Sequence, residues 1–131
     1  AATLERDDTA DRFDILPLLV ATDGAIAAFG RDRRRLRPNI VIGGVDGLAE
    51  RTWEGSGLRI GDVVIGLRNL RDRCVMTTFD PDTIEQDPHV LKSIVERFDG
   101  RLALNAFVVR PGVIRVGQHV DLLSPAELRA F

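Results

Sequence analysis

The chain has 131 residues, of which 44% are hydrophobic and 29% charged, and its formal net charge is −2. This size suits one soluble domain, the slightly negative charge argues against a nucleic-acid partner, and no apolar stretch approaches the roughly 20 residues that span a membrane. The single cysteine excludes an internal disulfide, so we expect a cytoplasmic location.

The first half of the chain predicts two strands and a short helix. The apolar run at residues 15–20 is typical of a buried strand, and Pro17 favours an edge because it cannot donate a ladder hydrogen bond. Thr22 is a helix cap, and the helix that follows it is expected to end before Gly30. Residues 39–43 predict a second strand, because the centre of this segment is β-branched throughout.

A loop rich in glycine and charge is expected at residues 43–57, with Trp53 as its large anchor. The second half of the chain predicts more strands and two helices. The strands lie at residues 63–70, 102–109 and 113–123, one helix runs from the pair Asp87-Pro88 to a stop at Gly100, and a last helix begins at the capping box Ser124-Pro125-Ala126-Glu127.

Two segments of the chain resemble each other, residues 58–64 and residues 114–120. Each has an arginine between apolar residues and then a glycine before another strand. We interpret them as two corners of a closed sheet, where glycine allows a tight bend, and the alternative is a shared binding role. Short strands with frequent glycine turns and few helices predict a mainly β fold, a β-barrel or barrel-like sheet.

Cys74 is the first candidate for chemistry. A lone cysteine is often a small buried hydrophobe, but Arg71 and Arg73 stand two and one residues before this one. Neighbouring positive charge stabilises a thiolate, the form that binds metals and attacks electrophiles. A strand would place Arg73 and Cys74 on opposite faces, so the arginines can act on the thiol only if the chain turns here.

Oxygen-bearing side chains follow Cys74 closely. Asp80 and Asp82 would suit a hard cation such as magnesium, whereas the interpretation we favour is a turn whose backbone these side chains satisfy. The hydroxyl groups of Thr77 and Thr78 offer a further alternative, donation to an anion.

Residues 31–37 carry the densest positive charge. Such a run is usually a solvated loop, and the alternative is an anion-binding rim for a phosphate. Arg37-Pro38-Asn39 differs from the rest. Proline fixes the approach to the next strand, and an asparagine at the start of that strand offers a donor and an acceptor to a flat heterocycle.

These motifs together resemble the MOSC domain, which is found in molybdenum-cofactor sulfurases and in amidoxime-reducing molybdenum enzymes. The resemblance covers residues 13–123 and depends on the order and spacing of its pieces. Ile84 and Leu104 depart from the pattern, where the family often has glycine and glutamine. The matching pieces are Arg37-Pro38-Asn39-Ile40-Val41, Arg73-Cys74, Thr77-Thr78, Asp80-Pro81-Asp82-Thr83, Leu104-Asn105 and residues 110–117.

The resemblance implies a MOSC-like β-barrel with a few short helices and a site for the molybdenum cofactor (molybdopterin). By that analogy Cys74 is the catalytic residue, either a thiolate ligand of molybdenum or a carrier of labile sulfur. The remaining residues of the implied cofactor site are Arg37, Asn39 and Asn105 at the pterin or its phosphate, Arg73 beside the cysteine, and Thr77 and Asp80 shaping the pocket.

The same analogy implies an oxidoreductase that takes electrons from a partner protein and reduces N-oxygenated compounds. Many cofactor-binding members carry a separate β-domain in front, so we expect an electron-donor protein or such an N-terminal β-domain as partner. Two alternatives stay open: a sulfur carrier with a persulfide on Cys74, and a non-catalytic binding module in which Cys74 is inert packing. Residues 1–12 are interpreted as a polar N-terminal segment and residues 13–131 as the MOSC-like domain.

Overall fold

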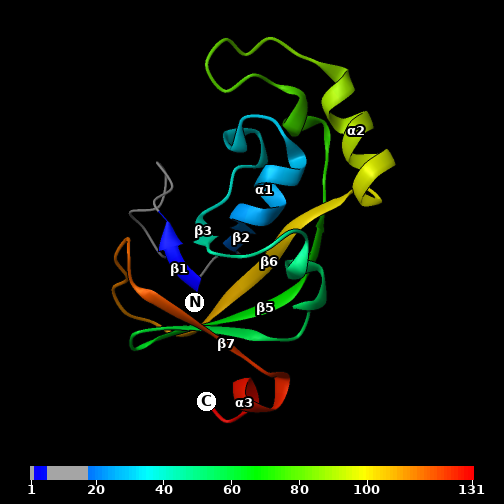
Figure 1. The fold of residues 1–131 in the computed structure, drawn as a ribbon. Coiled ribbons are helices and arrows are strands. Elements are labelled where there is room, and N and C mark those ends of the chain that lie inside the picture. The colour runs from blue at the N-terminus through cyan, green and yellow to red at the C-terminus, as the bar shows by residue number, and fades with distance from the viewer. Residues whose placement is uncertain (1, 6–17) are drawn as a thin grey trace.

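The computed structural model describes residues 2–5, by their backbone alone, and residues 18–131. Within these residues seven strands close into a barrel in the order β1-β3-β2-β6-β5-β4-β7, which confirms the predicted mainly β class (Figure 1). Neighbouring strands are antiparallel except for the parallel pair β2 and β3. The strands are β1 (Ala2–Glu5), β2 (Leu18–Thr22), β3 (Ile40–Gly43), β4 (Gly57–Ile60), β5 (Val63–Asp72), β6 (Arg101–Arg110) and β7 (His119–Leu123).

Short helices occupy the two ends of the barrel. In Figure 1, α1 and α2 lie together at one end, and α3 follows β7 at the other. No helix in the described part of the chain has the length and apolar character needed to cross a bilayer. The helices are α1 (Asp23–Phe29), α2 (Pro88–Phe98) and α3 (Pro125–Arg129), with three 3-10 helices, η1 (Arg33–Leu36), η2 (Ala49–Thr52) and η3 (Val75–Thr78).

The predicted helix caps are confirmed. The side chains of Thr22, Asp87 and Ser124 each accept a hydrogen bond from a backbone N–H in the first turn of the following helix. At the other end of α1, Gly30 takes the left-handed conformation (φ 73°) in which glycine is favoured. These boundaries were predictable because each depends on contacts within a few residues.

The hydrophobic core has two layers. Alternate strand residues, such as Leu18, Val20 and Leu104, fill the barrel interior. The opposite face of the sheet is also covered, because Leu19 packs beneath α1. This double burial explains why all five residues of β2 are buried and why the segment reads as a continuous apolar run. The second layer lies between α1, η1, α2 and the start of β6.

Two expectations about strands are wrong. Residues 113–118 form a loop rather than the start of a strand, and Val113 is 79% exposed there. The backbone N–H of Arg115 donates to Oε1 of the Gln118 side chain (2.6 Å), whereas in a strand it would donate to a carbonyl of a neighbouring strand. The other error concerns the edge position, since β2 pairs with both β3 and β6; Pro17 itself lies outside the described residues.

The described part of the N-terminal segment forms a strand of the barrel, and the two similar segments form two of its corners. Residues 2–5, predicted as part of a polar segment, form β1 and pair with β3 and β7. The predicted boundary at residues 12 and 13 lies outside the described residues. The two similar segments are corners, as expected, because Gly61 (φ 60°) and Gly117 (φ 92°) make left-handed turns before β5 and β7.

Candidate functional site

Cys74 lies where β5 has ended and a 3-10 helix begins. Its backbone is extended and caps η3, and its carbonyl oxygen accepts hydrogen bonds from Thr77 N (3.1 Å) and Thr77 Oγ1 (2.9 Å). The side chain is exposed. The strand therefore ends before Cys74 and a helical turn begins directly after it, and the interpretation of Cys74 as a small buried hydrophobe is wrong.

Two arginines, Arg71 and Arg73, interact electrostatically with this cysteine, and a third, Arg37, interacts with Arg73. Burial, followed by repulsion from Arg71, lowers the pKa of Arg73 to about 10; the charge of Cys74 opposes this shift and Arg37 adds to it. Burial also lowers the pKa of Arg71, again opposed by Cys74. These interacting residues come from two segments of the chain. We call Cys74, Arg37, Arg71 and Arg73 the Cys74 cluster.

Backbone carbonyls hold Arg73 in this cluster. Its Nη2 atom donates to the carbonyl oxygen of Leu36, at the end of η1, and Nη1 donates to that of Leu102 (3.5 Å) in β6. Arg37 follows Leu36 directly and is exposed in a left-handed conformation (φ 57°). Because this conformation is costly for any residue but glycine, the surrounding structure must hold Arg37 there.

A row of amides holds Arg71. Its Nε atom donates to Asn105 Oδ1 (2.6 Å), and Asn105 Nδ2 donates to Asn69 Oδ1 (3.3 Å). Both asparagines lie opposite each other on β5 and β6. The predicted site residue Asn105 therefore holds Arg71, one of the two arginines whose charge acts on Cys74.

The other predicted site residues have supporting contacts. Asn39 Oδ1 accepts from Leu19 N (2.8 Å) and so aligns β3 with β2. Thr77 is buried, and its hydroxyl donates to the Cys74 carbonyl rather than to an anion. These two residues shape the surroundings of the Cys74 cluster through the backbone.

Asp80 closes its own turn. Its Oδ1 atom accepts from Asp82 N (2.8 Å) and Thr83 N (3.0 Å), and these bonds hold the pKa of the Asp80 carboxyl below its ordinary value. The carboxylate of Asp82 is bound by Arg34 (2.8 Å). The turn interpretation of this segment is confirmed. Both carboxylates that a magnesium ion would need already have partners within the protein.

Glu50 is a buried acid that sequence reasoning missed. It has no exposed surface, its Oε1 atom accepts from Thr22 Oγ1 (2.9 Å), and its Oε2 atom has no hydrogen-bond partner among the described residues. Burial raises the pKa of its carboxyl group. No sequence signal marked it, because a glutamate in a loop rich in glycine and charge is normally solvated.

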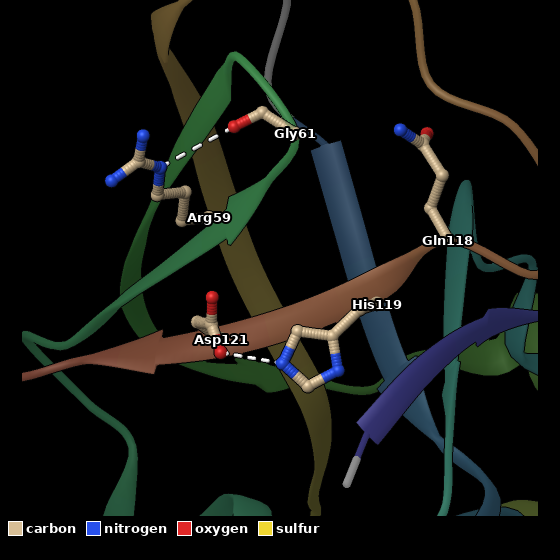
Figure 2. A pocket seen from close by; sticks show the side chains of 5 residues that line it. All are labelled: Arg59, Gly61, Gln118, His119 and Asp121. Atoms are coloured by element: carbon tan, nitrogen blue, oxygen red, sulfur yellow. Dashed lines mark hydrogen bonds and ion pairs between the residues drawn. The ribbon is translucent and has the colours of Figure 1, made fainter.

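A separate polar depression of about 410 Å³ lies where β4 and β7 pair (Figure 2). His119 Nε2 lies 2.6 Å from Asp121 Oδ1, and Asp121 faces Arg59 across the strand pair. The two similar sequence segments meet here, yet none of the predicted site residues lines the depression. Its lining residues are Arg59, Gly61, Gln118, His119 and Asp121.

Comparison with known proteins identifies relatives of this chain. It is 34% identical to human "Mitochondrial amidoxime-reducing component 1" over 130 residues, which covers 85% of this chain and 38% of that protein. It is 37% identical to human "Mitochondrial amidoxime reducing component 2" over 76 residues, 53% of this chain and 22% of that protein. The chain therefore spans well under half the length of these relatives.

Solved structures share the fold at low sequence identity. The YuaD protein from Bacillus subtilis matches 82% of this chain and 63% of its own, with a TM-score of 0.61 and 18% identity. YiiM from Geobacillus stearothermophilus matches 85% of this chain and 62% of its own, with a TM-score of 0.59 and 15% identity. The family model of the MOSC domain matches residues 24–121, most of the chain. The chain therefore belongs to the MOSC domain family.

Proposed function

We propose that this chain is the molybdenum-cofactor-binding domain of an oxidoreductase that reduces N-oxygenated compounds, with Cys74 as the metal ligand. The observation that carries the proposal is an exposed thiol within electrostatic reach of two guanidinium groups, those of Arg71 and Arg73. The names of the human relatives, amidoxime-reducing components, support the substrate class.

The Cys74 cluster has the donor set that such a cofactor needs. A soft thiolate suits a redox-active transition metal, and arginine forks suit a phosphate group. The arginines repel one another, because Arg71 and Arg37 both lower the pKa of Arg73, and a bound anion would offset that repulsion. The residues present therefore fit the cofactor.

Within the proposal each residue has a definite task. Cys74 binds the metal, Arg37 and Arg71 bind the anionic part of the cofactor, and Arg73 orients the segment that carries the thiol. Asn39 aligns β3 with β2, Asn105 holds Arg71 in place, and both residues would contact the pterin. When bound, the cofactor supplies the two-electron chemistry that removes oxygen from an N-hydroxylated substrate.

The partners belong to the same proposal. Because the chain spans 38% of the first human relative, an electron-donor protein or a further β-domain would complete the enzyme. The compartment is also a proposal: the single cysteine supports the cytoplasm, whereas both human relatives are mitochondrial by name.

A sulfur carrier is the second candidate, and the exposure of the Cys74 thiol favours it. A persulfide needs an accessible sulfur that can be loaded and unloaded, and the neighbouring arginines would stabilise its negative charge. This candidate requires no resident metal, which separates it from the first.

The test is the metal content of protein purified from a host that makes the cofactor. We expect near-stoichiometric molybdenum by elemental analysis, with pterin fluorescence, and its loss in Cys74→Ser. Met76→Leu is the matched control, since it changes an exposed sulfur two residues away and should keep the metal.

Equal molybdenum in wild type and Cys74→Ser would refute a metal site at this residue. Metal-free protein that releases one thiocyanate per chain on cyanolysis, and none in the serine variant, would instead establish the sulfur carrier. Circular dichroism of each variant shows whether the barrel is intact.

A further inference from the structure

Arg35 of η1 reaches the end of η3, the helix that Cys74 caps. Its Nη1 atom donates to the carbonyl oxygens of Thr78 (3.0 Å) and Thr77 (3.4 Å), and its Nη2 atom lies 3.6 Å from Asp80 Oδ2. The Arg35 side chain is only 13% exposed. Carbonyls at the end of a helix lack intrahelical partners and attract cations, so Arg35 holds the last turn of η3 in place.

Arg73 makes the return contact. It lies just before η3, and its Nη2 atom donates to the carbonyl oxygen of Leu36, the last residue of η1. The two short helices pack against each other, and each ends on an arginine from the other segment. Because Arg37 follows Leu36 and Cys74 follows Arg73, this reciprocal pair sets where Arg37 leaves η1 and where Cys74 enters η3.

Two successive contacts join Arg35 to Cys74. The backbone and hydroxyl of Thr77 both donate to the Cys74 carbonyl, and the Thr77 carbonyl accepts from Arg35. Thr77 is 1% exposed, so water does not compete for these bonds. A shift of the Arg35 side chain would reach the Cys74 backbone through this single residue.

We propose that Arg35 is a positioning residue, which holds the Cys74 thiol beside Arg71 and Arg73 without touching the sulfur. The inference rests on the proposed function for its purpose, since a metal or sulfur site needs the thiol and the anion-binding arginines in fixed register. A planar guanidinium suits the task because it binds two carbonyls and a carboxylate at once, which the point charge of a lysine does not.

The test compares two thiol reagents on the metal-free chain, in which Cys74 is the only cysteine. One reagent is the dianion 5,5′-dithiobis(2-nitrobenzoate) and the other is neutral 2,2′-dithiodipyridine. The ratio of their rates reports how closely positive charge surrounds the thiol. We expect Arg35→Gln to lower this ratio about tenfold, and Arg35→Lys to give an intermediate value. A purely structural loosening would raise both rates and leave their ratio unchanged.

Arg34→Gln is the matched control. Arg34 lies in the same helix, is exposed, and binds Asp32 and Asp82 rather than the carbonyls of η3. Both variants remove one positive charge from η1, so a difference between them reports the contacts with η3. We therefore expect only Arg35→Gln to lower the ratio of the two rates strongly. Equal ratios in the two variants would overturn the positioning role. Because the assay contains no molybdenum, its outcome does not depend on whether the chain binds the metal.

Discussion

Glu50 shows how burial changes the chemistry of a single residue. Its carboxyl group has no exposed surface, and the hydrogen bonds from the backbone and hydroxyl of Thr22 offset only part of the cost of burying a charge. The pKa of Glu50 is therefore raised in the folded protein. The carboxyl group therefore stays neutral in the folded protein over a range of pH in which it is already deprotonated in the unfolded chain.

This raised pKa makes stability depend on pH. The contribution of Glu50 is fully present below its unfolded pKa and is lost as the pH rises through its folded pKa. Glu50→Gln removes this titration, so the free energy of unfolding of the variant should gain on that of wild type as the pH rises. The gain is about 1.4 kcal/mol for each unit by which the folded pKa exceeds the unfolded one.

Urea denaturation between pH 4 and pH 8 measures this effect. Glu54→Gln, a change at an exposed glutamate in the same segment, should give a curve parallel to that of wild type. A constant difference between Glu50→Gln and wild type over the whole range would mean that Glu50 stays charged in the folded protein.

Ile84 combines a strained backbone conformation with an exposed side chain, so no burial offsets the strain. Its φ is 64° although it is β-branched, and its side chain is 75% exposed. Glycine relieves the left-handed strain but loses more chain entropy on folding. We therefore expect Ile84→Gly to raise the free energy of unfolding by about 0.5–1 kcal/mol in thermal or urea unfolding. Ile84→Ala keeps the left-handed strain and should gain less, and a loss of stability in Ile84→Gly would contradict the account.

At the scale of elements, α2 covers the start of β6 with one apolar face. Val90, Ile94 and Phe98 are four residues apart, so they lie on one face of the helix, and they are buried in the same cluster as Leu102. Val95, the apolar residue next to Ile94, is 56% exposed. Spacing alone places a residue near a face, whereas the neighbouring elements decide how wide the buried part is.

The N-cap of α2 offers a test of local control. Asp87 Oδ1 accepts from His89 N (3.0 Å), and Asp87→Ala should lower the free energy of unfolding by about 1 kcal/mol. Asp87→Asn keeps the acceptor and should remain close to wild type in the same urea titration. Equal losses in both variants would assign the effect to the charge and its exposed pair with Arg31 instead of to the cap.

At the scale of the whole molecule, barrel closure brings distant segments together. β1 pairs with both β3 and β7, although residues 2–5 and 119–120 lie at opposite ends of the chain. The Cys74 cluster likewise combines η1 with the segment after β5. Such pairings have no local pattern, because a polar four-residue strand is recognisable only from the neighbours that its backbone joins.

The sequence by itself determined the family, the mainly β class, the helix caps and the candidate role of Cys74. These features depend on residue type and short spacing, which a chain carries whether or not it is folded. Only the tertiary structure decided that Cys74 is exposed, that Arg35 and Arg73 cross between two helices, and that Glu50 is buried. Burial and contacts between segments more than 30 residues apart arise from the packing of the whole barrel, so no local stretch of the chain predicts them.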